Sequence, residues 1–385
     1  MTPRFSRALL LAALALTAIY LVFDAPLGGA APAPAGGTAA ARAAAAVARR
    51  GAAAPRWTRA LLYAYHENAE CATNFAFLMA HGRWDLWNAS TLFVVVVNGF
   101  DASIAVPDHP SFVMLRRENA GLDFGAHAAG LARVAEAAAA AGSPPPDEYG
   151  FLNCGMTGPF LPAYATDADW FGAFSARLSP AVRLVGAYLT CLPPTDLGGP
   201  GPRIEGHSFF TDRAGVELLV AAGVLRAHAD KLDAIVNGEW GLARAVFAAG
   251  GTIDTLLYRY QGVDWRAPEN AACNEQLFVG RAGGYGGGDV NPFETIFFKR
   301  LWRTLDAPDR SVRWAETARL MAWRDGWAAG AGGRSARPVI PKEPPYKRGS
   351  AETDVAAIFE KPHVRRVPAP AAPADDAYDE PEAKA

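Results

Sequence analysis

The feature that most constrains the fold is an uninterrupted apolar segment at residues 92–98, which reads Leu-Phe-Val-Val-Val-Val-Asn. Its β-branched residues favour a strand. Because these residues do not alternate with polar ones, both faces of the strand should be buried, as in a parallel sheet covered by helices. The segment therefore predicts an α/β fold with a mostly parallel open sheet.

Other strand and helix patterns flank this segment along the chain. Strands are predicted at residues 61–65, 112–115, 149–153, 182–190, 207–211 and 252–258. Helices are predicted from the loop after 112–115 to about residue 141, and at 169–178, 213–224 and 237–251. Strands that alternate with helices indicate βαβ units. We therefore place one α/β domain at residues 57–327.

The two ends of the chain differ from this middle part. Residues 1–23 hold two arginines ahead of an apolar run, which is typical of a signal-anchor with a cytoplasmic N-terminus. A cleaved signal peptide fits the same residues, and a plastid transit peptide is a third interpretation. Residues 24–56 predict a flexible stem and residues 328–385 a disordered Pro-rich tail, because both have few large apolar side chains.

Charge and cysteine content narrow the class of protein. The formal net charge of −2 argues against nucleic-acid binding, which usually shows as a strongly basic domain. A glycosylation sequon at Asn88-Ala-Ser90, with the N-terminal segment, favours a lumenal domain at the ER or Golgi membrane, or a secreted one. The four cysteines form no Cys-x-x-Cys pair, so they predict one or two disulfides or four buried thiols.

The loop between the strand at 112–115 and the Ala-rich helix is where we expect a ligand. In open α/β sheets, ligands bind outside the carboxyl ends of the strands. The loop carries Arg116, Arg117, Asn119, Gly121 and Asp123. Asp123 is placed either to accept a hydrogen bond from a sugar hydroxyl or to cap the helix. The two arginines either pair with a diphosphate or form a solvated strand end.

Two motifs argue against other chemistries. The Gly-rich stretch at 282–288 lacks the Gly-Lys-Ser/Thr ending of a P-loop, which argues against nucleoside-triphosphate hydrolysis. The stretch is interpreted either as a mobile lid or as a linker. A hydrolase is a further alternative, but the sequence has no Gly-x-Ser-x-Gly elbow to support it.

Four segments in order, at residues 117–125, 151–159, 205–211 and 238–250, resemble the rhamnan-synthesis protein F family of glycosyltransferase-like proteins. They are more loosely similar to the glycosyltransferase-A fold, with its Rossmann-like nucleotide-sugar half. The resemblance covers roughly residues 63–260. It implies transfer of a hexosyl or deoxyhexosyl group from a nucleotide-sugar donor onto a glycan acceptor. The alternative is an inactive relative that serves as a glycan-binding or scaffold subunit.

The resemblance also assigns donor-binding residues. Asn119, Gly121, Asp123 and Asn153 would line the nucleotide pocket. Asn153 stands where many such enzymes place an Asp-x-Asp that holds Mn²⁺ or Mg²⁺. Here the sequence departs, because Asn153 is followed by Cys and Gly, and hard cations prefer charged oxygen ligands. The metal ligands are therefore left open, and the Asp-x-Asp that ends at Asp169 is interpreted as a helix cap.

Glu239 is the candidate catalytic base, since enzymes of this fold often place an acid here to deprotonate the acceptor hydroxyl. Such positioned proton removal contributes about 10²–10⁴-fold. The alternative is compensation of the helix dipole. His207, Ser208 and Trp240 are candidate acceptor contacts, with structural roles as the alternative.

Overall fold

The computed structural model describes residues 57–84, 90–162, 164–165, 168–196, 200–280, 284–286, 290–299 and 320–325. The predicted signal-anchor, stem and C-terminal tail lie outside these residues, as do Asn88 of the sequon and most of the Gly-rich stretch. Within the described residues, no helix has the length and apolar character needed to cross a membrane.

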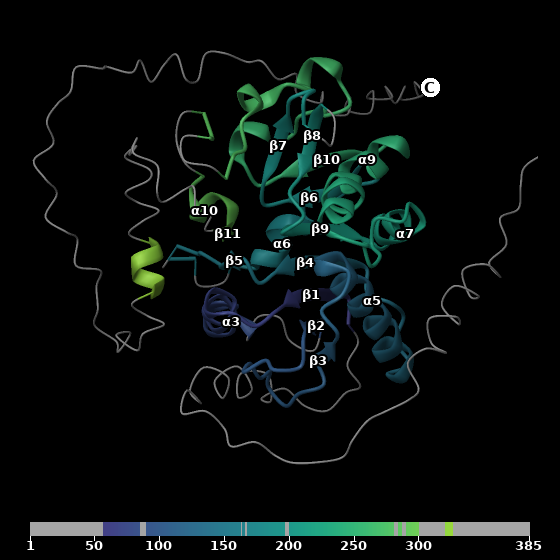
Figure 1. Ribbon diagram of the computed structural model, residues 1–385, viewed down its shortest axis with the longest axis vertical. Coiled ribbons are helices and arrows are strands. Elements are labelled where there is room, and N and C mark those ends of the chain that lie inside the picture. Colours follow the sequence, from purple (N-terminus) through teal and green to yellow (C-terminus); the bar gives the residue numbers. More distant parts are fainter. Residues whose placement is uncertain are drawn as a thin grey trace, which may run out of the picture.

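A seven-stranded sheet forms the centre of the described fold (Figure 1). Its strands are β1 (Arg59–Tyr65), β2 (Thr91–Asn98), β3 (Phe112–Arg117), β4 (Glu148–Asn153), β6 (Val182–Gly186), β9 (Ser208–Asp212) and β10 (Thr252–Thr255). They are ordered β10-β6-β9-β4-β1-β2-β3. Neighbouring strands are parallel except that β9 runs antiparallel to β4 and to β6. The prediction of a mixed α/β fold with a mostly parallel sheet is confirmed.

Strand β2 has the environment that its sequence predicts. All of its residues are buried, and it pairs in parallel with β1 on one side and β3 on the other. Burying each Val or Leu side chain contributes about 1.5–3 kcal/mol, so this strand anchors the core.

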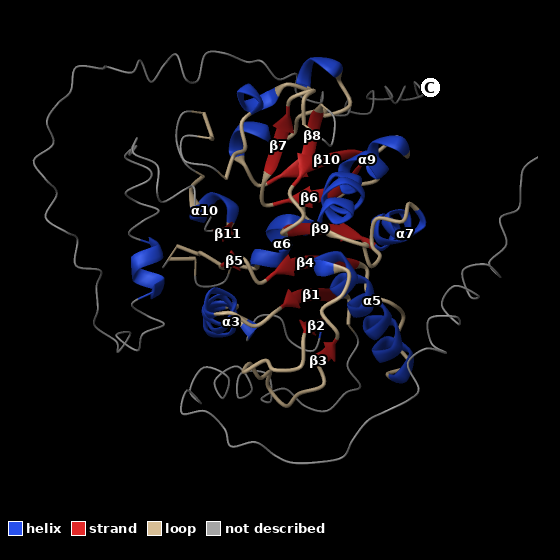
Figure 2. Ribbon diagram, viewed as in Figure 1, coloured by secondary structure: helices blue, strands red, loops and turns tan. Residues whose placement is uncertain are grey.

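Helices cover both faces of the sheet (Figure 2). They are α3 (Ala69–His81), α5 (Leu122–Ala140), α6 (Trp170–Ser175), α7 (Arg213–Ala221) and α9 (Trp240–Ala248). Successive side chains of a strand point to opposite faces. Accordingly, Phe209 stacks on Phe124 of α5, with ring centroids 6.3 Å apart, whereas Phe210 stacks on Phe174 of α6 at 3.9 Å. The sheet is therefore the middle of three layers.

The structure departs from the prediction after β4. Residues 182–190 form two strands, because the chain leaves the sheet at Gly186 and continues as β7 (Leu189–Leu192). Strand β7 pairs with β8 (Gly201–Ile204) in a separate two-stranded sheet. The predicted helix at 237–251 begins earlier, with α8 (Lys231–Asp233) and a π-helical turn, η2 (Ala234–Glu239), ahead of α9. Helix α3 was not predicted.

A short two-stranded sheet lies next to the end of β4. Strand β5 (Met156–Thr157) pairs antiparallel with β11 (Phe298–Lys299). The helix α10 (Pro292–Thr295) precedes β11 and is capped by the Asn291 side chain, which accepts a hydrogen bond from the Phe293 N–H. The pairing brings a late segment of the chain beside Asn153.

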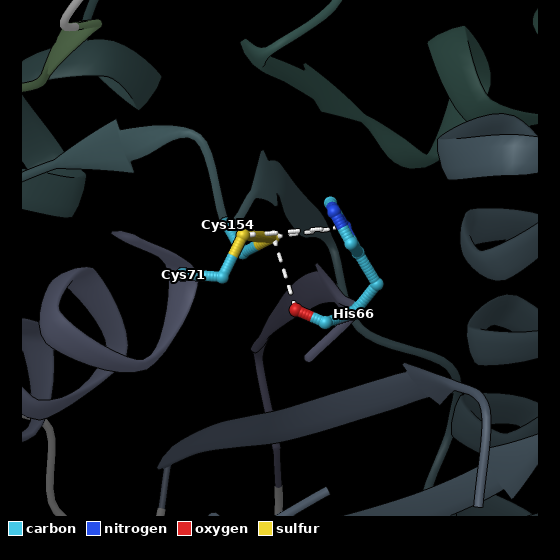
Figure 3. Close-up of side chains that lie close together, drawn as sticks. All are labelled: His66, Cys71 and Cys154. Atoms are coloured by element: carbon cyan, nitrogen blue, oxygen red, sulfur yellow. Dashed lines mark hydrogen bonds between the residues drawn. A yellow bond between two sulfur atoms is a disulfide. The ribbon is translucent and has the colours of Figure 1, made fainter. Parts of the chain in front are cut away.

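All four cysteines are paired, which resolves the alternatives left by the sequence. Cys71 is bonded to Cys154, and Cys191 is bonded to Cys273. The first disulfide joins the first turn of α3 to the residue that follows β4 (Figure 3). His66, after β1, places its Nδ1 3.4 Å from Cys154 Sγ.

Candidate functional site

The loops that carry the candidate residues meet at one edge of the sheet. Strands β1 to β4 are parallel, so their carboxyl ends share an edge. Strand β9 is antiparallel to β4, with Ser208 paired to Leu152, so the start of β9 lies at the same edge. The Asn153 N–H donates to the His207 carbonyl oxygen at 3.0 Å, which fixes the two loops side by side.

Asp123 and Asn153 form a hydrogen-bonded pair at this edge. Asn153 Nδ2 donates to Asp123 Oδ2 at 2.7 Å, and Asn153 Oδ1 accepts from the Gly155 N–H at 3.1 Å. The N-cap of α5 is Gly121 and has no side-chain hydrogen bond, so the capping interpretation of Asp123 is wrong. Burial raises the pKa of Asp123, while the Asn153 amide and the nearby Lys299 charge oppose that rise.

Gly121 has a structural reason to be glycine. Its φ is 72°, and a Cβ there would lie 2.6 Å from Ala227 Cβ. Leu122 follows with φ 56° and is 39% exposed. A β-carbon in this region is strained, so the tight turn needs support from its neighbours. Asn98 supplies it by donating to the Leu122 carbonyl oxygen at 3.3 Å.

The two predicted arginines of this loop donate hydrogen bonds to other groups of the protein. Arg116 donates to the carbonyl oxygens of Phe100, at 3.0 Å, and Ala102, at 3.3 Å. Arg117 Nη1 donates to Asn98 Oδ1 at 2.9 Å. Both contacts stabilise the loops around β2 and β3, so a diphosphate contact from either arginine stays a prediction, as does one from the exposed Asn119.

Glu205 and Glu239 form an acid pair near Asp123. Glu239 Oε1 accepts from the Gly206 N–H at 2.9 Å, and Glu205 Oε1 accepts from Thr190 Oγ1 at 2.7 Å. Burial, together with the adjoining Glu239 carboxyl, raises the pKa of Glu205 to about 7. A neighbouring carboxylate disfavours the charged form of an acid. The charge of Glu239 raises the pKa of Asp123 as well.

Lys299 is a cation near these acids and was not predicted. Its charge lowers the pKa values of both Asp123 and Glu205. A Cβ on Gly155 would be 3.7 Å from Lys299 Cε and 3.2 Å from Asn153 Oδ1. The lysine therefore lies beside Asn153, at the position where the resemblance implies a metal.

The predicted acceptor contacts fall into two groups. His207 and Ser208 are 3% and 0% exposed, so they pack beneath the edge and do not face an acceptor in this conformation. The His207 ring contacts Tyr188 with centroids 4.9 Å apart, and burial lowers its pKa well below the usual value. Trp240 is half-buried, and the Arg203 guanidinium lies over its ring at 4.3 Å.

The donor set at Asn153 does not fit a divalent cation. Its amide oxygen is engaged by Gly155, and the next residue, Cys154, is in a disulfide. In the part of the chain that the structure describes, His66, Cys71 and Cys154 are the one group of three ligand-type side chains close enough to share an ion, and two of them are the bonded sulfurs. Asp169 caps α6 by accepting from the Gly172 N–H at 3.0 Å, as predicted, and Asp167 lies outside the described residues.

Comparison with known proteins gives a distant likeness among solved structures. No protein-family model and no curated protein matches the sequence. Among solved structures, the mannosyltransferase PcManGT from Pyrobaculum calidifontis, in complex with GDP-Man and Mn²⁺, is similar with 14% sequence identity and a TM-score of 0.29. The matched region covers 56% of this chain and 59% of that enzyme. A likeness at this level assigns neither a family nor an activity to the chain.

Proposed function

We propose that this protein is a glycosyltransferase that moves a hexosyl or deoxyhexosyl group from a nucleotide-sugar donor onto a glycan acceptor. One observation carries the proposal. Asp123, Asn153, Glu205, Glu239 and Lys299 come from segments far apart in the sequence and meet at the carboxyl edge of the sheet. An open α/β sheet places its ligands at that edge.

The residues of this site have distinct roles in the proposed reaction. Asp123 accepts a hydrogen bond from a donor hydroxyl, and Lys299 offsets the negative charge of the diphosphate. Glu239 takes the proton of the acceptor hydroxyl. The acceptor oxygen then attacks the anomeric carbon, the bond from that carbon to the diphosphate breaks, and the nucleoside diphosphate leaves. Direct displacement in this way inverts the anomeric centre.

The proposed reaction does not route charge through a metal ion. Lys299 lies beside Asn153, where an Asp-x-Asp would hold the cation, and it supplies a positive charge at that place. We therefore propose a cation-independent site. This choice rests on the residues present, an amide and a lysine, which are poor ligands for Mn²⁺ and Mg²⁺.

We also propose a lumenal location at the ER or Golgi membrane, with residues 1–23 as the anchor, or secretion as the alternative. Two disulfides support an oxidising compartment, because such bonds are rare in the cytosol. The domain boundaries at residues 57–327 remain part of this proposal.

A glycan-binding subunit without catalysis is the second candidate. The observation in its favour is that Asn153 lacks a carboxylate and uses both polar atoms of its amide within the protein. In that case the same residues would bind a saccharide without transferring one.

A screen of nucleoside-diphosphate sugars for thermal stabilisation, repeated with Mn²⁺ and with EDTA, tests the proposal. We expect one sugar nucleotide to raise the melting temperature equally in all three conditions, since ligand binding stabilises only the folded state. Release of nucleoside diphosphate during incubation with mixed glycan acceptors would then separate a transferase from a binding subunit. Stabilisation by none of the donors would remove the proposed function.

A further inference from the structure

A second concave surface begins one residue after Glu239. It is a groove of about 660 Å³ between β8, α9 and the loop that follows β10. Three arginines and three aromatic residues line it, namely Arg203, Arg244, Arg266, Trp240, Phe247 and Trp265, and its remaining walls are Pro, Gly and Ala. We refer to it as the arginine groove. Within the described residues that line it, no acidic side chain is present.

The three arginines differ in how far their charge is already offset. Arg266 forms a forked pair with Asp264, at 2.8 and 2.9 Å. Arg203 is 4% exposed, lies over Trp240, and has the Asp196 carboxylate 4.0 Å from its Nη1, with Glu205 and Glu239 further contributing negative charge. Arg244, by contrast, is exposed and donates to neutral oxygens, the Val236 carbonyl at 2.9 Å and Asn237 Oδ1 at 3.4 Å. Arg244 therefore presents the charge that a ligand can use.

The groove is also built to keep its shape. Its two walls are joined through Cys191, which pairs with Pro202 of β8 and forms a disulfide with Cys273. Asn270 Nδ2 donates to the Asp264 carbonyl oxygen at 2.7 Å and closes the loop that carries Arg266. A preformed groove loses less conformational entropy when a ligand binds.

The position of the groove indicates which substrate it takes. Direct displacement needs the leaving group and the acceptor on opposite sides of the anomeric carbon. Trp240, which lines the groove, directly follows Glu239 in the chain, and Arg203, which also lines the groove, lies over the Trp240 ring. An extended acceptor with its reacting hydroxyl at Glu239 would therefore continue into the arginine groove.

We propose that the arginine groove binds an anionic saccharide, the part of the acceptor next to the reacting sugar. This inference rests on the proposed function. A sugar ring packs its C–H face against the Trp240 and Phe247 side chains, as aromatic residues offer large apolar faces. A carboxylate or sulfate on that ring accepts hydrogen bonds from the Arg244 guanidinium, whose planar fork suits such groups. Acidic glycans are thus preferred over neutral ones.

Binding of short oligosaccharides to the full-length protein tests this inference. An oligogalacturonate and its methyl ester differ only in charge, and sulfated and unsulfated galactans form a second pair that separates carboxylate from sulfate recognition. We expect the charged member of at least one pair to bind about tenfold more tightly, and the difference to shrink as salt rises. Equal affinity for charged and neutral members of both pairs would overturn the inference.

Two substitutions, Arg244→Gln and Arg244→Lys, test whether the charged glycan binds at Arg244. The Gln variant should lose most of the charge preference and the Lys variant should keep part of it. The matched control is Arg133→Gln, because Arg133 lies on α5 and is 38% exposed in its side chain. A Gln variant that binds the charged glycan as the wild type does would also overturn the inference.

Thermal stabilisation by a nucleotide-sugar donor distinguishes failure of this inference from failure of the proposed function. Nucleotide-sugar stabilisation is measured on the same preparations without any glycan. Charge-dependent glycan binding with no donor stabilisation would support the anionic site and overturn the transferase. Donor stabilisation with no charge preference would leave the transferase standing and remove the anionic acceptor.

Discussion

The carboxyl groups of Asp123 and Glu205 have different partners. Asp123 is bonded to an amide that donates to it, whereas Glu205 adjoins a second carboxyl, that of Glu239. An amide donor supports the charged form of an acid, and a like charge opposes it. The first arrangement suits a fixed acceptor of hydrogen bonds and the second suits a group that exchanges a proton. The comparison therefore divides the site into a binding side, Asp123 and Asn153, and a proton-transfer side, Glu205 and Glu239.

Removing the base should give the largest effect. We expect Glu239→Gln to lower turnover by about 10²–10⁴-fold while donor affinity stays near normal, because Gln keeps an oxygen for the Gly206 N–H but cannot take a proton. Steady-state rates and donor binding, measured separately, check this. A variant that turns over at near wild-type rate would place the base elsewhere.

On the binding side, Asp123→Ala should abolish stabilisation by nucleoside diphosphate. The variant should lose about 1 kcal/mol of stability without ligand, because Asn153 Nδ2 loses its acceptor. Thermal unfolding with and without nucleotide measures both effects. Asp212→Ala is the control, since Asp212 caps α7 at the opposite edge of the sheet, and it should lose stability yet keep the nucleotide effect.

Between the two sides, Lys299→Met should weaken nucleoside-diphosphate binding about tenfold, or about 1.4 kcal/mol, because one positive charge near the diphosphate is lost. Lys231→Met removes an exposed lysine of α8 and should bind normally. Calorimetric titration in EDTA checks the comparison. Unchanged affinity in Lys299→Met, or binding that requires Mn²⁺, would contradict the role of the lysine.

The last comparison concerns the raised pKa of Glu205. The pKa of Glu205 is raised to about 7 in the folded protein, above its unfolded value, so the folded state binds more protons between those two values. Wild-type stability from this group is therefore present at low pH and lost as pH rises towards 7. Relative to wild type, Glu205→Gln should gain about 1–2 kcal/mol between pH 5 and pH 8.

Urea unfolding of both proteins across this pH range measures the difference. Buried His127, with its pKa lowered to about 3, produces the opposite trend, but it does so in both proteins and cancels. Parallel curves for the two proteins would mean that the pKa of Glu205 is not raised in the folded state.

The parallel half of the sheet could be predicted from sequence because its signals are local. The β-branched run of β2 and the Ala-rich α5 specify their own conformations, and the loop between β3 and α5 pointed to Asp123. The antiparallel direction of β9 has no such signal, because the residue pattern of a strand does not show whether it pairs in parallel or antiparallel. Its direction is set by pairing with β4 and β6.

The same distinction explains the site residues. Asn153 and Glu239 stand in recognisable segments, so the sequence led to them. Glu205 lies in one of those segments too, but only its contact with Glu239 identifies it. Lys299 lies near Asn153 because β11 pairs with β5. This is a contact between distant parts of the chain, and no local sequence pattern indicates it.

The Cys71–Cys154 bond has a practical consequence for anyone who produces this protein. Cys154 directly follows Asn153, and the bond closes a chain separation of 83 residues, a span for which cross-linking contributes about 4–5 kcal/mol in the chain-entropy account. Protein made in a reducing bacterial cytoplasm would lack this disulfide next to Asn153. Export to a periplasm, or secretion from eukaryotic cells, is the expression route that matches the architecture.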